Sequence, residues 1–200
     1  MTASLLIVLA AVMPGCGDQR TQPPELLLVG GNAKTIAWKN EGGGLALRYP
    51  ASWTLTSGKP PSLVTITTGG AIATIYAYPR DDLGTDQASV EAQRKRIVDS
   101  LQLRAPGFKR FATPITTVDG SPAVEVLGRG LINDRVVRAR SVHVFKPNVE
   151  WVVDAYAVPS EFRRANRVGF GPILRSLKLA DAVHANGGGG GGEDGGDDGA

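Results

Sequence analysis

The stretch that decides the fold is LALRYPASW, residues 45–53. Large apolar side chains recur at every second residue from Leu45 to Tyr49, which is the period expected of a half-buried β-strand. Pro50 has no backbone N–H with which to continue a strand ladder, so the strand ends there. The chain then turns, and the large side chain of Trp53 returns toward the core. This stretch therefore predicts a strand, a tight bend and a buried aromatic in close succession.

Further strands are predicted on both sides of this stretch. Gly69-Gly70 suits a two-residue hairpin turn, and Asp119-Gly120, Asn133-Asp134 and Pro147-Asn148 turn the last four strands into a meander. Pro114 interrupts the first strand of that meander, which favours an edge position or a bulge. The predicted strands are residues 36–39, 45–49, 53–56, 63–68, 72–78, 108–118, 123–132, 135–145 and 150–158.

Two helical segments separate these strands. The first, residues 89–103, has an apolar side that includes Val90 and Ile97, with Arg94, Lys95 and Arg96 largely opposite. The second follows Pro159, with Ser160 as the expected N-cap. Pro172 cannot lie inside one straight helix, so two short helices are predicted there, the second beginning near Gly171-Pro172. The order of strands, helix, four strands and helix predicts an α+β fold, a mainly antiparallel sheet with helices packed on it.

Alternation along the meander divides its side chains between two faces of the sheet. The predicted core face holds Val124, Val126, Val137, Ala139, Trp151, Val153 and Ala155. The opposite face would hold the charged residues Glu125, Arg129, Arg138, Arg140 and Asp154. These charges are interpreted either as a solvated sheet face with weak cross-strand ion pairs or as a partner-binding surface.

The N-terminus carries the one cysteine of the chain, Cys16, directly after an apolar run and Pro14-Gly15. A short apolar segment that ends in a small residue is typical of a secretory signal and is too short to span a bilayer. Met13-Pro14-Gly15-Cys16 resembles the lipobox of bacterial lipoproteins, in which the cysteine sulfur is acylated. The alternative is an ordinary apolar N-terminus, because residues 1–15 lack the Lys or Arg that usually opens a signal.

Composition and charge suggest one domain between two flanking segments. We expect a lipoprotein signal peptide at 1–15, a lipid-anchored tether at 16–35, an α+β domain at 36–180 and a Gly-rich, acidic, disordered tail at 181–200. Residues 41–180 contain 19 Lys and Arg against 12 Asp and Glu, whereas the tail contains five acidic residues and no basic ones. The basic body could attract anionic lipid headgroups or cell-wall polymers, or be an ordinary soluble surface. Nucleic acid is not an expected partner, because no aromatic–basic motif is present.

Catalytic and metal-binding patterns are not recognisable in this sequence. His143 lies within a predicted strand and His184 near the tail, and no Gly-x-Ser-x-Gly motif accompanies them. No His, Asp or Glu cluster has metal-ligand spacing, and Gly128-Arg129-Gly130 is not a phosphate loop. We therefore expect no catalytic residue, no metal and no cofactor.

Residues 45–53, with their Tyr-Pro and following Trp, resemble the start of PsbP-like domains. This family includes the photosystem II extrinsic subunit PsbP and many bacterial lipoproteins, among them the mycobacterial LpqN type. The end of the domain also matches, from the strand at 151–158 through Pro159-Ser160-Glu161-Phe162 to Phe170 and residues 173–177. The resemblance covers roughly residues 36–180 and implies an antiparallel sheet with packed helices, but it carries no catalytic residues.

These observations predict a non-enzymatic lipoprotein, anchored to the cell membrane through lipid on Cys16, on its extracytoplasmic face. It would bind or assemble with an envelope protein. The alternatives are a carrier of a small amphipathic ligand in a sheet–helix pocket and, least favoured, an envelope hydrolase using His143. A filled interior would favour the protein-binding module, and a deep apolar pocket the carrier. A cleft that places His143 beside a carboxylate and a serine would favour the hydrolase.

Overall fold

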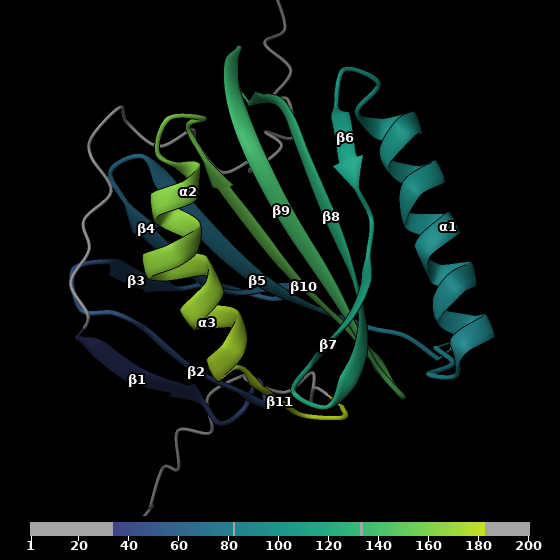
Figure 1. Ribbon diagram of the computed structural model, residues 1–200. Coiled ribbons are helices and arrows are strands. Elements are labelled where there is room, and N and C mark those ends of the chain that lie inside the picture. The colour runs from purple at the N-terminus through teal and green to yellow at the C-terminus, as the bar shows by residue number, and fades with distance from the viewer. Residues whose placement is uncertain (1–33, 82, 133, 183–200) are drawn as a thin grey trace, which may run out of the picture.

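The computed structural model describes residues 34–81, 83–132 and 134–182, which form two antiparallel sheets and a few helices (Figure 1). The strands are β1 (Thr35–Asn40), β2 (Leu45–Pro50), β3 (Thr54–Ser57), β4 (Ser62–Thr68), β5 (Ala71–Pro79), β6 (Lys109–Ala112), β7 (Ile115–Val118), β8 (Ser121–Ile132), β9 (Arg135–Lys146), β10 (Val149–Ala157) and β11 (Lys178–Leu179). The helical elements are α1 (Gln87–Arg104), α2 (Phe162–Ala165), the π-helical turn η1 (Asn166–Phe170) and α3 (Gly171–Ser176). The predicted α+β fold with a mainly antiparallel sheet is confirmed.

The large sheet has the strand order β3-β4-β5-β10-β9-β8-β6, and β7 also pairs with β8. Its hairpins turn at the predicted places, because Thr68 pairs with Ala71, Val118 with Ser121 and Lys146 with Val149. Asp119 and Gly120 both have positive φ, 48° and 75°, as the tight turn between β7 and β8 requires. The predicted strand at 108–118 is divided at Pro114 into β6 and β7, with a register shift in β6, so the expected edge or bulge is confirmed.

The smaller sheet, β1-β2-β11, is built around the strand that begins the stretch at residues 45–53. Leu45 and Leu47 are buried along β2, and the strand ends at Pro50 as predicted. Trp53 then turns inward, with its ring edge-on to Phe170 at a centroid distance of 5.7 Å. A Cβ atom on Gly169 would lie 2.1 Å from the Trp53 ring, so only glycine fits at that position.

Both faces of the large sheet are covered. On one face, which we call the α2–α3 face, the helical segment from α2 to α3 packs on a large core (Figure 1). This core buries Trp53, Trp151, Phe162 and Ile173 together, which confirms the predicted burial of Trp53 and Trp151. On the other, the α1 face, α1 packs beside β8 over a smaller core. That smaller core contains Leu83, Val90, Ile97, Val124, Val126 and Phe145.

The helices begin and end close to the predicted limits, with two differences. Helix α1 is capped by Asp86, whose carboxylate accepts hydrogen bonds from the N–H groups of Ala88 and Ser89. The expected N-cap at Ser160 is wrong, because α2 begins at Phe162 after Glu161 and has no side-chain cap. A second helix does begin at Gly171, but the helical segment is continuous. Because Pro172 cannot donate a hydrogen bond to the preceding turn, the ladder widens there, and Gly171 N–H bonds to Asn166 O five residues back.

The predicted signal peptide at 1–15, Cys16, most of the tether at 16–35 and most of the tail at 181–200 lie outside the described residues. These assignments remain predictions. Within the described residues, no helix is long and apolar enough to cross a membrane.

Candidate functional site

The five charged residues predicted to share one sheet face do not all share it. Residues opposite each other in an antiparallel pair point to the same side. Arg129 pairs with Arg138, and Arg140 pairs with Ala155, so these arginines and Glu125 lie on the α2–α3 face. Asp154 pairs with Ser141 and therefore points to the α1 face, which corrects the prediction for that residue.

The predicted core face is divided in the same way. All seven of its residues are buried, but Val124, Val126, Val137 and Ala139 lie on the α1 face. Trp151, Val153 and Ala155 lie on the α2–α3 face. Alternation gives the two sides of each strand but not how the sides match across a turn. Both faces of this sheet are covered and each carries apolar side chains, so an apolar residue does not show which of the two faces it lies on.

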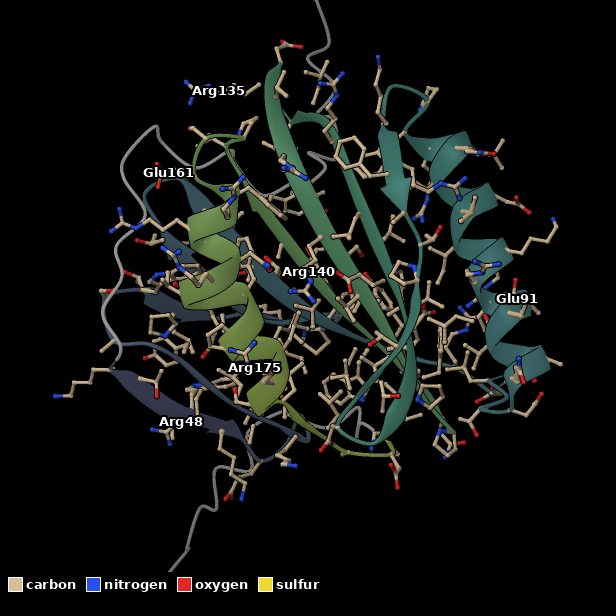
Figure 2. All side chains as sticks on the ribbon, in the orientation of Figure 1. Arg48, Glu91, Arg135, Arg140, Glu161 and Arg175 are labelled. Carbon is tan, nitrogen blue, oxygen red and sulfur yellow. The ribbon has the colours of Figure 1, made fainter. Side chains whose placement is uncertain are left out.

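Two of the predicted charges form a half-buried ion pair beneath the helical segment. Arg140 Nε lies 2.7 Å from Glu125 Oε1, and Arg140 Nη1 donates to Asn166 Oδ1 at 2.7 Å. Figure 2 shows Arg140 in the middle of the molecule, between the helical segment and β8, whereas Arg135 lies at the far end of β9. Arg140 and Glu125 thus tie β8 and β9 to η1, and they are not available to a partner.

Arg129 and Arg138, in contrast, line a surface groove. Two hollows adjoin there and share Arg138 and Pro159. The first, about 290 Å³, is lined by Arg138, Pro159, Ser160, Arg163, Arg164 and Arg167. The second, about 360 Å³, is lined by Phe111, Arg129, Val136, Arg138 and Pro159. We call the two hollows together the arginine groove, and its five arginines are all exposed.

Arg138 is held in place at the centre of this groove by two aromatic rings. Its guanidinium carbon lies 5.4 Å from the centroid of Phe111 and 5.0 Å from that of Phe162. A guanidinium at this distance from a ring is attracted by the ring's negative face, an interaction that leaves the cation's charge uncompensated. The rings orient Arg138, and its N–H groups can still bind an anion.

The charges of the arginine groove are not balanced by nearby carboxylates. Across the part of the chain that the structure describes, none of these five arginines has an Asp or Glu oxygen within ion-pair distance. Five like charges around the two adjoining hollows repel each other and create a positive potential that attracts an anionic group. The groove is therefore suited to binding an acidic ligand.

The sequence analysis missed Arg163, Arg164 and Arg167, as well as Phe111. Arg163 and Arg167 are four residues apart and so lie on one side of a helical segment, which was a readable signal. That Arg163 and Arg167 lie beside Arg138 depends on how the helical segment packs on the sheet, and no local sequence signal predicts it.

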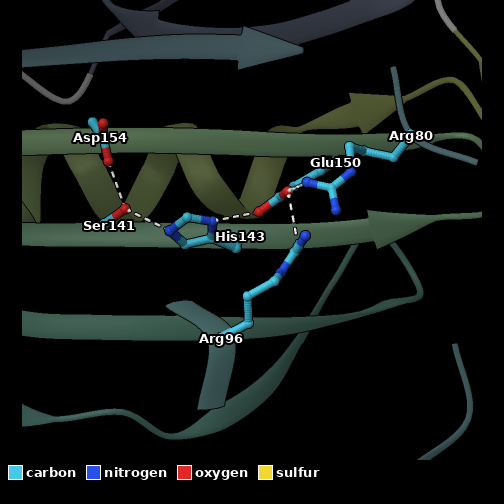
Figure 3. A network of polar contacts seen from close by, with 6 residues as sticks. All are labelled: Arg80, Arg96, Ser141, His143, Glu150 and Asp154. Atoms are coloured by element: carbon cyan, nitrogen blue, oxygen red, sulfur yellow. Dashed lines mark hydrogen bonds and ion pairs between the residues drawn. The ribbon is translucent and has the colours of Figure 1, made fainter. Parts of the chain in front are cut away.

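On the α1 face, the structure brings a serine, a histidine and a carboxylate into line (Figure 3). His143 Nδ1 lies 2.8 Å from Glu150 Oε1, and His143 Nε2 lies 3.2 Å from Ser141 Oγ. Glu150 Oε2 accepts hydrogen bonds from Arg80 and Arg96, each at 3.3 Å. Arg96, expected on the outer side of its helix, thus reaches the sheet and fastens α1 to β10.

The hydrogen bonds of this serine do not suit a nucleophile. Ser141 Oγ donates its one proton to Asp154 Oδ1 at 2.5 Å, so toward His143 it can only accept. A catalytic serine needs the reverse arrangement, in which the imidazole accepts the hydroxyl proton. Ser141 also lies within β9 between β8 and β10, where the backbone N–H groups form the sheet ladder and not an oxyanion hole. The alignment therefore favours a structural network over a hydrolase.

The same network extends to a partly buried tyrosine, Tyr156. Burial, together with the Asp154 carboxylate, raises the pKa of the Tyr156 phenol well above its ordinary value of 10. The phenol thus keeps its proton and can donate it to Asp154. In the described residues, no group of three or more His, Cys, Asp or Glu side chains is placed to hold a metal ion.

Comparison with known proteins gives structural likeness without sequence likeness. No family model matches the chain, and no curated protein matches it in sequence. The solution structure of cyanobacterial PsbP from Synechocystis is similar, with a TM-score of 0.52, 15% identity, and coverage of 75% of this chain and 95% of that one. The crystal structure of LpqN from Mycobacterium tuberculosis, a protein involved in cell envelope biogenesis, is also similar. Its TM-score is 0.52 and its identity 14%, and the match covers 74% of this chain and 91% of LpqN. At these identities the likeness establishes the fold alone: the chain has the PsbP-like fold.

Proposed function

We propose that this protein is a non-enzymatic, lipid-anchored module on the extracytoplasmic face of the cell membrane, which binds an acidic envelope protein in the arginine groove. The observation that carries the proposal is the set of five exposed arginines without a carboxylate partner among the described residues. The lipobox-like Met13–Cys16 supports the anchor. The structural similarity to LpqN, a protein involved in cell envelope biogenesis, supports the location.

The packing of the interior favours this function over the carriage of an amphipathic ligand. A carrier would hold its ligand between the helical segment and the sheet. That space is occupied by the side chains of Trp53, Phe162, Phe170 and Ile173, which are at most 8% exposed. The contact of Trp53 with the Gly169 backbone leaves no room there even for a methyl group. The hollows lie instead at the surface, where a protein partner can reach them.

The test of binding is capture from intact membranes by chemical crosslinking. Arg163→Glu with Arg167→Glu reverses two groove charges at exposed positions, and we expect the crosslinked partner to disappear. Lys34→Glu with Lys59→Glu is the matched control, because both lysines are exposed and lie outside the residues lining the groove. The control should capture the partner normally, and capture by wild type should weaken as salt rises. Equal capture by both double variants would contradict the proposal.

The anchor is tested separately by partition between membrane and soluble fractions. Acylated Cys16 should hold the protein in the membrane fraction, since stable anchoring requires more than one lipid chain and a lipoprotein cysteine carries two on its sulfur-linked glyceride. Cys16→Ala should move the protein to the soluble fraction. A Cys16→Ala variant that stays membrane-bound, with an unmodified thiol in the wild type, would refute the anchor and leave the groove proposal standing.

A further inference from the structure

We infer that the arginine groove recognises a two-part segment, in which one apolar side chain lies next to a short run of carboxylates. This inference rests on the proposed function and names the chemistry of its partner. Its basis is the division of the groove into two adjoining hollows of different character. One hollow is lined by Arg163, Arg164 and Arg167, and the other by Phe111, Val136 and Arg129.

The first hollow, which we call the cationic hollow, is suited to the acidic part of the ligand. Arg163 and Arg164 of α2 and Arg167 of η1 line this hollow together with Arg138, so four arginines border one space. A single carboxylate would leave most of this charge uncompensated, and a run of carboxylates balances it. Guanidinium groups bind carboxylates through paired N–H donors, which a lysine cannot do in the same geometry.

The second hollow is suited to the apolar side chain of the ligand. Phe111 and Val136 both line this hollow and are 54% and 50% exposed, so about half of each side chain is open to a ligand. With Pro159 they form an apolar floor of three side chains, enough to cover one leucine-sized group. A lipid acyl chain is many times longer than this floor. The lining therefore favours a protein segment over a membrane lipid as the occupant.

Arg138 joins the two hollows. Its guanidinium lies close to the rings of both Phe111 and Phe162, and Arg138 lines both hollows, so the same side chain borders the apolar floor and the cationic hollow. A carboxylate bound to Arg138 would bring the neighbouring apolar side chain of the same segment over Phe111. We therefore expect the apolar and acidic residues of the partner to be adjacent in its sequence.

The experiment measures the binding of labelled synthetic peptides to the full chain with Cys16→Ala, so that no acyl group contributes. One peptide carries a leucine followed by four acidic residues. The second replaces that leucine by serine, and the third replaces the acids by their amides. We expect the first peptide to bind most tightly. The affinity of the second should be lower by a factor of roughly ten or more, and the third should not bind detectably. Phe111→Ala should reduce the difference between the leucine and serine peptides, and because Phe111 also orients Arg138 it should weaken the binding of both.

The outcomes separate this inference from the proposed function. Equal affinity for the leucine and serine peptides would overturn the two-part segment. A second result would also overturn it: no peptide binds, but the protein binds vesicles of anionic phospholipid and this binding requires Arg163 and Arg167. The occupant of the groove would then be a lipid surface. If no peptide binds but capture from membranes still depends on these arginines, the inference fails and the proposed function stands.

Discussion

Two charged regions on opposite faces of one sheet differ in how their charges are balanced. On the α1 face, the Glu150 carboxylate is shared by Arg80, Arg96 and His143. In the arginine groove at the edge of the α2–α3 face, the five arginines have no carboxylate partner among the described residues. The first region uses its charges to hold α1 against the sheet. The second leaves its charges available, which is the property expected of a binding site.

Two arginines that the sequence places on one strand and one face also differ in how their charges are balanced. Arg138 and Arg140 are two residues apart on β9 and point to the same face. Arg140 is paired with Glu125 and Asn166, whereas Arg138 lies over the rings of Phe111 and Phe162 and has no ion pair with a described carboxylate. A charge therefore has to be judged by its partners and not by the face on which it lies.

The largest expected effect is on the packing that supports the groove. Trp53→Ala removes a ring that is 3% exposed and contacts Phe170 and Gly169, so the helical segment carrying three groove arginines loses its support. We expect a loss of about 3–5 kcal/mol in the free energy of unfolding. Denaturant unfolding followed by circular dichroism measures it. An unchanged midpoint would show that Trp53 does not support this segment.

A smaller effect is expected in the paired region. Glu150→Gln removes the charge that Arg96 and His143 share, while its amide keeps nearly the same shape. Because Glu150 is only 8% exposed but Arg96 is 39% exposed, we expect a loss of about 1–3 kcal/mol in stability. Partner capture should not change. Reduced capture at unchanged stability would mean that the α1 face takes part in binding, which would break the comparison.

The smallest effect concerns another paired carboxylate. Burial alone would raise the pKa of Asp119, but the Leu179 N–H and the Lys178 and Lys146 ammonium groups outweigh it and hold that pKa below its ordinary value of 3.8. Its contribution to stability is therefore complete above that pH and is lost as the pH falls through the lowered pKa. Asp119→Asn, which tolerates the positive φ, should lower stability at neutral pH by less than about 1 kcal/mol.

Unfolding midpoints of wild type and Asp119→Asn measured between neutral pH and pH 2 test this effect. The two curves should converge in acid, because the wild-type carboxylate is then protonated. Asp99→Asn is the control, since Asp99 pairs with Lys95 at an exposed position. Curves that diverge in acid would contradict the sign of the pKa shift.

Local features of the fold could be predicted from the sequence because they depend on neighbouring residues. Asp119-Gly120 and Pro147-Asn148 mark turns by their own backbone preferences, and Trp53 follows a strand ended by Pro50. The face to which Asp154 points depends on its pairing with Ser141 in another strand, and the alternation pattern does not contain that information. The expected N-cap at Ser160 failed because α2 begins two residues later.

The candidate site was predictable only in part for the same reason. Arg129 and Arg138 were identified from their strands, and both line the groove. Arg140 and Glu125 were identified by the same reasoning, yet the helical segment covers them and they pair with each other. Arg163, Arg164 and Arg167 come from a distant part of the chain. Only the packing of residues 162–176 on the sheet brings them beside Arg138.

The most direct test of the central claim compares Arg138→Gln with Arg140→Gln, measuring both the unfolding midpoint and partner capture for each. The substitutions are chemically identical, and the two positions share a strand and a face. We predict that Arg138→Gln abolishes capture and leaves the midpoint nearly unchanged, whereas Arg140→Gln lowers the midpoint and leaves capture by the folded protein intact. If Arg140→Gln abolished capture at unchanged stability while Arg138→Gln had no effect on it, the claim that unpaired arginines form the binding site would be wrong.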